Sequence, residues 1–283
     1  MPLTVGKALQ TTNRALMAVS ETAWLDARTL LSHLVDKPHA WVLAHPEQEL
    51  TDEQATRLEA YLERLSAGEP LPYILGYWEF FGLDFSITPH VLIPRPETEL
   101  LVEEAIAWLQ GNPGRRKTVD VGTGSGCIAI SLAKHVPDVS VIACDISEQA
   151  LQMATRNAQR HDVTGRVSFV RADLLSATTG QVDLICANLP YIPTLKLQEL
   201  EVARYEPILA LDGGDDGIEL IARLVTQART RLAAGGMMLL EVEATAGGEC
   251  LPLVTHAFPQ AKVELLPDLA GLDRLIRLEN TAG

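Results

Sequence analysis

The chain has 283 residues, enough for a domain of ordinary size together with a smaller one. It carries 23 Lys and Arg against 37 Asp and Glu, which gives a formal net charge of -14. A protein that neutralises a phosphate backbone usually shows the opposite balance or a basic stripe. The charge therefore argues against direct DNA binding.

Targeting signals and cysteine usage bear on the compartment in which the protein works. The first twenty residues lack the unbroken apolar core of a signal peptide, and no apolar run is long enough to cross a bilayer. None of the cysteines forms a CxxC pair, and most lie within apolar runs: Cys127, Cys144, Cys186 and Cys250. Reduced, buried thiols fit this pattern better than disulfides or zinc. We expect a cytoplasmic protein with no membrane association and no metal.

Residues 1–70 show the period of amphipathic helices and predict a small N-terminal helical domain. Within it, Thr51 and Gln54 have the spacing of a capping box. We expect Trp24 and Trp41 to anchor the core of this domain. Residues 71–95 then combine glycines with aromatic and β-branched residues, a pattern that predicts a hairpin linker.

A second domain is predicted over residues 96–283, with a helix that begins near Pro96. From Lys117 on, short apolar runs alternate with helical patterns, and this alternation predicts an α/β fold with a mostly parallel sheet covered by helices. The runs predicted as strands are KTVDVG, SVIACD, RVSFVRAD, VDLICAN, GMMLLEVE, AKVELL and LIRLE.

The segment VDVGTGSGCIAI places Gly122, Gly124 and Gly126 in the turn after the first of these strands. Glycines permit a tight bend and a close approach of a ligand to bare backbone, and a helix start supplies unpaired N–H groups. Asp145 ends the next strand about twenty residues later, where a carboxylate can accept both ribose hydroxyls. Asp173 ends the third strand at the same edge of the sheet. These residues predict a nucleoside site.

The spacing of the glycines helps to choose the nucleoside. It is G-x-G-x-G rather than the dinucleotide fingerprint G-x-G-x-x-G, and the lysine of a phosphate-binding loop is absent. S-adenosylmethionine has a cationic sulfonium and no phosphate, so it suits several carboxylates better than a pyrophosphate does.

The stretch VDLICANLPYIP joins a buried strand directly to Asn188, Leu189, Pro190 and Tyr191. These residues could be simple turn formers, or they could hold a planar NH2 group. In the second interpretation Asn188 offers its side-chain oxygen, Leu189 offers its carbonyl oxygen, and Tyr191 lies flat against the group. Pro190 holds Leu189 in an extended conformation.

Several of these segments, taken in order, resemble the peptide chain release factor N5-glutamine methyltransferase family over nearly the whole chain. They are PLPYILGYWEFFGLDF, VLIPRPETELLV, VDVGTGSGCIAI, ACDIS, NLPY, YEPILALDGGDDG and DLAGLDRLIRLE. The resemblance implies a Rossmann-like class I methyltransferase domain, a helical domain that docks the substrate, and S-adenosylmethionine as cofactor. It also implies a monomer that methylates the glutamine of the Gly-Gly-Gln loop of release factors.

The same resemblance assigns roles to individual residues. Cofactor binding falls to Gly122, Thr123, Gly124, Ser125, Gly126, Asp145, Asp173, Leu174 and Asn188. Substrate binding falls to Asn188, Leu189, Pro190 and Tyr191, with Asn188 and Tyr191 as the catalytic pair. The family motif is Asn-Pro-Pro-Tyr, so Leu189 departs from it, and we expect an effect on rate rather than on reaction type.

Three alternatives remain open. The substrate could be a glutamine of a ribosomal protein, or the chain could be an adenine-N6 DNA methyltransferase, although the net charge argues against a groove for a flipped base. A binding protein that keeps the cofactor fold without catalysis is the third. For Arg95 and Glu97 in IPRPETE, a role as first-turn helix residues and a role beside the cofactor are equally supported.

Overall fold

The computed structural model describes residues 2–20 and 22–281, and the chain divides into two compact units, Met1–Tyr77 and Trp78–Gly283. The division falls inside strand β1, so most of the hairpin after the helices belongs to the second unit. Among the described residues, no helix has both the length and the apolar character that a membrane span requires.

The first unit is helical, and its helices pack on one another through their apolar faces. The predicted capping box is present at α4: the Thr51 side chain accepts from the N–H of Gln54, and the Gln54 side chain accepts from the N–H of Thr51. Trp24 is 46% exposed, so its predicted role as a core anchor is wrong. The helices are α1 (Val5–Leu16), α2 (Ala23–Val35), α3 (His39–Ala44), α4 (Asp52–Ser66) and α5 (Leu71–Leu75).

The second unit is built on a seven-stranded sheet in the order β5-β4-β3-β6-β7-β9-β8. The first five of these strands pair in parallel, and only the pairs of β9 with β7 and with β8 are antiparallel. The strands are β3 (Lys117–Val121), β4 (Ser140–Asp145), β5 (Val167–Arg171), β6 (Val182–Ala187), β7 (Leu232–Glu241), β8 (Lys262–Pro267) and β9 (Asp273–Glu279). The predicted mostly parallel α/β fold is confirmed.

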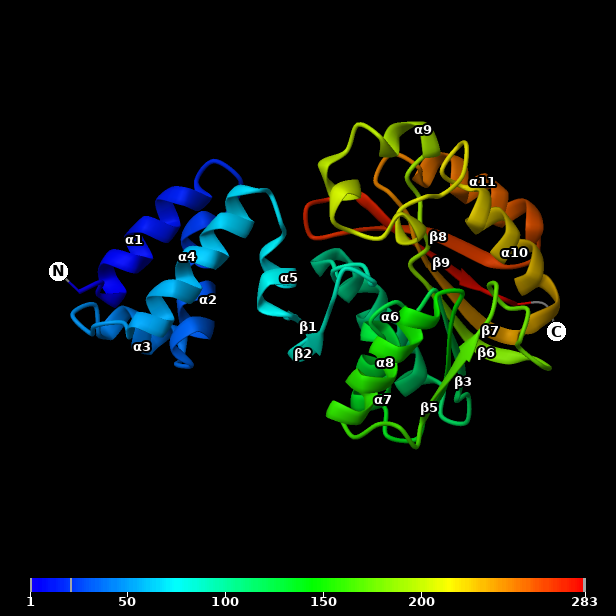
Figure 1. Cartoon of the computed structure of the whole chain (residues 1–283). Helices are drawn as coiled ribbons and strands as arrows, with labels where there is room; N and C mark the ends of the chain where they lie inside the picture. Colours follow the sequence, from blue (N-terminus) through cyan, green and yellow to red (C-terminus); the bar gives the residue numbers. More distant parts are fainter. Residues whose placement is uncertain (1, 21, 282–283) are drawn as a thin grey trace. The chain divides into compact units, whose positions relative to one another are not determined.

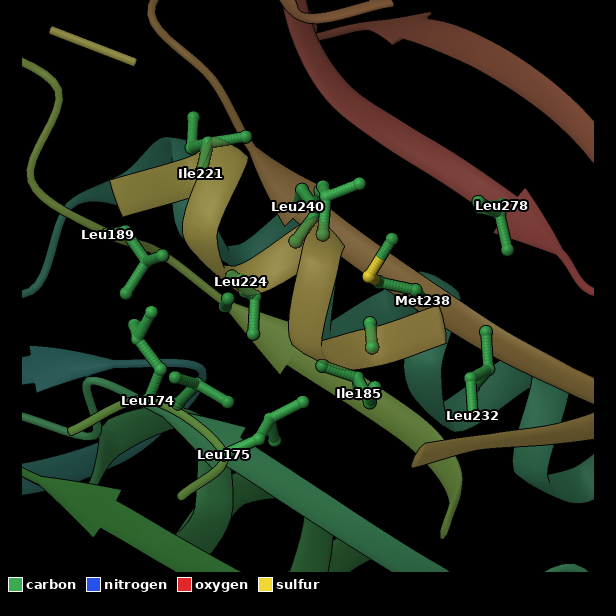
Figure 2. Packing of buried hydrophobic residues seen from close by; sticks show 14 of the residues in the cluster. Leu174, Leu175, Ile185, Leu189, Ile221, Leu224, Leu232, Met238, Leu240 and Leu278 are labelled. Carbon is green, nitrogen blue, oxygen red and sulfur yellow. The ribbon is translucent and has the colours of Figure 1, made fainter. Parts of the chain in front are cut away.

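Helices cover both faces of this sheet (Figure 1). One face carries α6 (Glu99–Gly111), α7 (Cys127–His135) and α8 (Glu148–Arg160). The opposite face carries α10 (Glu219–Arg231) and α11 (Gly247–Ala257). Figure 2 shows the core beneath α10, where Leu224 lies among side chains from β6 and β7 such as Ile185 and Leu240.

Shorter elements lie outside these layers. A two-stranded hairpin, β1 (Tyr77–Phe80) and β2 (Leu83–Ser86), precedes an extended segment that leads to η1 (Pro96–Thr98) and then directly to α6. Between β6 and α10 the chain forms only short helices: α9 (Thr194–Leu197), η2 (Glu201–Arg204) and η3 (Ile208–Ala210). The predicted helix start near Pro96 corresponds to η1.

A buried asparagine of α8 connects the hairpin to the glycine-rich turn. The side-chain oxygen of Asn157 accepts from the N–H of Ser86 at 2.8 Å. Its Nδ2 donates to the carbonyl oxygens of Ser86 at 3.0 Å and of Ser125 at 2.8 Å. Asn157 is fully buried, so water cannot replace these partners if the amide is lost.

We therefore expect Asn157→Leu, which keeps the size of the side chain, to destabilise the protein by about 2 to 4 kcal/mol, because it leaves buried main-chain groups without partners. Urea unfolding followed by circular dichroism measures this change. Gln159→Ala, an exposed amide on the same helix, is the matched control and should change stability by less than about 0.5 kcal/mol. An Asn157→Leu midpoint equal to that of the control would contradict the prediction.

Candidate functional site

The parallel register brings four strand ends to one edge of the sheet. Val121 of β3 lies beside Cys144 of β4 and beside Ala187 of β6, and Ala187 lies beside Leu240 of β7. The next residue along each of these strands is Gly122, Asp145, Asn188 and Glu241. Ligands of open α/β sheets bind at this carboxyl edge.

The glycine-rich turn is held to the end of β4 by its own N–H groups. Those of Gly122 and Thr123 donate to the carbonyl oxygen of Cys144 at 2.8 and 3.0 Å. The N–H of Gly124 donates to Oδ2 of Asp145 at 2.9 Å. The turn and the acidic residue, which lie about twenty residues apart in the sequence, therefore form one structural unit.

Asp145 is well prepared to accept further hydrogen bonds. Its Oδ1 accepts from the N–H of Ser147 at 2.8 Å, so both carboxylate oxygens already have main-chain donors and each keeps a second lone pair. Burial raises the pKa of the Asp145 carboxyl group, while the N–H donors of Ser147, Gly124 and Ile146 oppose this shift.

A cavity of about 580 Å³ lies against this edge, within the usual range for small-molecule sites of about 300 to 1,000 Å³. Its walls include apolar side chains such as Ile146, Leu209 and Leu220. Eight of the residues proposed from the sequence line it: Gly122, Gly124, Asp145, Asp173, Leu174, Asn188, Leu189 and Pro190. The structure thus gathers most of the proposed site around one cavity.

Three residues of the glycine-rich segment do not line the cavity but contribute to the packing of the turn. Thr123 is buried and donates from Oγ1 to Oδ2 of Asp120 at 2.6 Å. Ser125 is also buried. Gly126 has a φ of 84°, and a Cβ there would lie 2.8 Å from Ile130 Cδ1. Gly126 thus permits close packing of α7.

Two charged residues meet at another part of the cavity wall. Asp173, proposed from the sequence to bind the cofactor, forms an ion pair with Arg223 of α10, and both residues line the cavity. Leu174 follows with a φ of 52°, an uncommon conformation for a leucine. Nothing in the sequence pattern singled out Arg223, because a basic residue in an amphipathic helix is ordinarily part of its solvated face.

The Asn188 side chain is oriented by a residue that the sequence interpretation did not select. Its Nδ2 donates to Oγ1 of Thr98 at 3.0 Å, so Oδ1 is the end of the amide that Thr98 leaves available. Thr98 is only 2% exposed and lies in η1, within the IPRPETE motif. Arg95 of the same motif pairs with Glu206 at 2.5 Å, and the N–H of Ile93 also donates to Glu206.

Tyr191, proposed as a catalytic residue, is half-buried and does not line the cavity. Burial raises the pKa of its phenol, and the negative charge of Glu241 adds to this effect. The phenol therefore stays neutral at physiological pH. The positive charges of Arg95 and Arg274 act in the opposite direction and lower this pKa.

Residues 211–217, LDGGDDG, support the segment that follows Asn188. The N–H of Ile192 donates to the carbonyl oxygen of Leu211 at 3.0 Å, and the N–H of Gly213 donates to the carbonyl oxygen of Ile192 at 2.9 Å. A Cβ on Gly217 would lie 2.4 Å from the carbonyl oxygen of Tyr191. The glycines of this loop therefore allow its backbone to lie directly against the NLPY segment.

Comparison with known proteins gives matches over both units. Residues 7–76 match the family model "PrmC N-terminal domain", and residues 97–204 match "Methyltransferase small domain". Among solved structures, the chain is similar to a T. thermophilus 16S rRNA methyltransferase in complex with AdoMet and guanosine. That likeness has a TM-score of 0.52 at 18% identity and covers 72% of this chain and 49% of the other, so it supports the fold alone.

Curated relatives are more similar and cover most of the chain. A release factor glutamine methyltransferase of Moorella thermoacetica is 39% identical over 276 residues, which are 96% of this chain and 97% of the relative. The protein of the same name from Nitratidesulfovibrio vulgaris is 39% identical over 257 residues, 89% of this chain and 86% of the relative. At this identity and coverage, the chain belongs to the release factor glutamine methyltransferase family.

Proposed function

We propose that this protein transfers a methyl group from S-adenosylmethionine to the side-chain amide nitrogen of the glutamine in the Gly-Gly-Gln loop of peptide chain release factors. The observation that carries the proposal is the Asn188 amide, which lies at the cavity wall with its nitrogen bonded to Thr98 and its oxygen left for an acceptor NH2 group. Family membership supports the choice of substrate.

The residues at the cavity fit S-adenosylmethionine. The Asp145 carboxylate keeps lone pairs for the two ribose hydroxyls, and the backbone of Gly122 and Gly124 is open to a close approach. Ile146 and Leu174 offer apolar surface for the adenine. When bound, the cofactor supplies an electrophilic methyl group on a cationic sulfur.

The acceptor side requires an explanation, because an amide nitrogen is a weak nucleophile. Its lone pair is delocalised into the carbonyl group, so hydrogen bonds accepted from the NH2 protons increase the electron density on nitrogen. We propose that Oδ1 of Asn188 and the carbonyl oxygen of Leu189 accept these two bonds, and that the neutral Tyr191 ring contacts the plane of the amide. Fixed acceptors of this kind act mainly by orientation and preorganised electrostatics.

The proposal extends to partners and compartment. The net charge of -14 disfavours a nucleic acid as acceptor, and the family relatives are named for release factors. We propose a monomer that works in the cytoplasm, where release factors act. A ribosomal protein glutamine is the alternative acceptor with the same chemistry.

A labelled methyl group from S-adenosylmethionine tests the substrate. The protein is incubated in parallel with a purified release factor, its Gly-Gly-Gln to Gly-Gly-Ala variant, ribosomal proteins and adenine-containing DNA. We expect label on the intact release factor only. Label on DNA or on a ribosomal protein would overturn the proposed substrate, and cofactor binding without any transfer would favour a binding protein.

Replacement of Asn188 with Ala tests the acceptor site. We expect kcat to fall by about 100- to 1,000-fold, the usual cost of one preorganised hydrogen-bonding group, because the NH2 group loses its side-chain acceptor. The Kd for S-adenosylmethionine, measured by calorimetry, should change by less than about threefold. Gln198→Ala, an exposed amide in the same segment, is the control and should keep kcat. An Asn188→Ala variant with normal kcat would remove Asn188 from the mechanism.

Replacement of Asp145 with Ala tests the cofactor site. Loss of charge-assisted hydrogen bonds to a ligand costs about 1.5 to 3 kcal/mol, so the Kd for S-adenosylmethionine should rise by about 10- to 150-fold. Asp215→Ala, at an exposed aspartate of the same unit, should leave the Kd unchanged. If both variants bind the cofactor equally well, the ribose does not lie at Asp145.

A further inference from the structure

A buried carboxylate joins two distant segments of the chain beside the cavity. Glu206 is 5% exposed, and its Oε2 accepts a hydrogen bond from the N–H of Ile93 at 3.1 Å. Its Oε1 accepts from the guanidinium group of Arg95 at 2.5 Å. These partners lie 113 and 111 positions earlier in the chain. One carboxylate therefore attaches the two segments through both of its oxygens.

Both of the joined segments continue directly into the cavity wall. Residues 90–92 line the cavity and end just before Ile93. Residues 207–210 also line it and begin just after Glu206. The bonds of Glu206 thus lie one residue from the wall on each side, where they can set how closely the two stretches of wall approach each other.

Residues 207–210 have few local features that would hold them in this place. Ile208 and Leu209 are 49% and 56% exposed, so packing restrains these side chains weakly. The main-chain hydrogen bonds described for this stretch join residues three or four positions apart. Such bonds shape a turn but do not place it relative to residues 90–92. The side chain of Glu206 supplies that long-range attachment.

A buried ion pair suits a positioning role better than a stabilising one. Withdrawing two charges from water costs about as much free energy as their attraction returns, and apolar side chains of similar size often stabilise a protein more. Two directed bonds on one carboxylate nevertheless define where their donors lie. The pair of Arg95 with Glu206 therefore contributes defined geometry at the edge of the cavity.

We propose that Glu206 and Arg95 are positioning residues, whose ion pair holds residues 207–210 beside residues 90–92 and keeps the cavity in the shape that binds S-adenosylmethionine. This inference rests on the proposed function, and for Arg95 it favours a role in the cofactor site over one in the helix start. The acceptor side has an attachment of its own, because Asn188 bonds directly to Thr98. Loss of the ion pair should therefore weaken cofactor binding more than methyl transfer.

Glu206→Gln tests the pair at nearly constant size. A glutamine offers an oxygen at only one of the two positions, so one of the two bonds is lost. We expect the Kd for S-adenosylmethionine, measured by calorimetry, to rise by about 5- to 20-fold, since apparent affinity falls with the fraction of molecules whose wall is in place. With saturating cofactor, kcat should stay within about threefold of the wild type. An unchanged Kd would overturn the inference.

Asp183→Asn is the matched control at the opposite edge of the sheet. Asp183 lies near the start of β6, pairs with Arg115 at 3.3 Å and accepts from two main-chain N–H groups at 3.1 Å. The Arg115 side chain is as exposed as that of Arg95, at 33%. We expect both variants to lose stability to urea, but Asp183→Asn should keep the Kd. An equal rise of Kd in the two variants would reduce Glu206 to a structural role.

Arg95 provides the second half of the test. Arg95→Met removes the charge, and the double variant with Glu206→Gln should bind S-adenosylmethionine no more weakly than the weaker single variant, because both changes break the same bond. Arg95→Lys keeps the charge and should bind within about threefold of the wild type. Single effects that multiply in the double variant would mean separate roles for the two residues and contradict the proposal.

Hydrogen exchange follows the wall itself and needs no acceptor. Peptides that cover residues 88–95 and 206–212 should exchange faster in Glu206→Gln than in the wild type, and at the wild-type rate in Asp183→Asn. Equal exchange in Glu206→Gln and the wild type would also overturn the inference. If the wild type binds S-adenosylmethionine but labels no release factor, the proposed substrate fails, while the Kd and the exchange rates still decide the role of the ion pair.

Discussion

The parallel register of β4, β3, β6 and β7 is the constraint on which the site depends. In this register, Val121 pairs with Cys144 and Ala187, and Ala187 pairs with Leu240. The pairing determines which side chains follow at the carboxyl edge. A shift of one residue in any pair would move its end residue to the other face of the sheet. The positions of the cavity, the glycine turn and Asn188 therefore depend on the same hydrogen bonds that hold the sheet together.

This arrangement brings buried and half-buried carboxylates close to the carboxyl edge of the sheet, and their hydrogen-bond donors differ. Asp145 receives main-chain N–H donors from the turn that it organises, and Asp120 receives bonds from Thr123 and Ala129. Among the described residues, Oε2 of Glu241 is buried without a hydrogen-bond partner, and Arg95 and Arg274 pair instead with Glu206 and Asp268. Burial raises the pKa of the Glu241 carboxyl group to about 7.

The sequence predicts the sheet well, and it singles out many residues that line one cavity, because both follow from local patterns. Apolar runs at strand spacing mark the strands, and glycines after a strand mark the turn. Prediction from the sequence fails for contacts that depend on packing between distant segments. Trp24 lies on a helix whose pattern does not say which side meets a neighbour, and it is exposed. Thr98 and Asn188 are 90 residues apart, and a threonine at a helix start has an ordinary local explanation.

The same reasoning explains how the NLPY segment can do without the first proline of the family motif. Leu189 is 4% exposed and belongs to the core cluster that includes Leu174 and Ile221, as Figure 2 shows. A Cβ on Gly122 would lie 3.2 Å from Leu189 Cδ2, so the leucine packs tightly over the glycine turn. A side chain held in a dense core restricts its own backbone, as a proline ring does by covalent geometry. Packing of Leu189 thus links the position of the NLPY segment to the glycine-rich turn, and both line the same cavity.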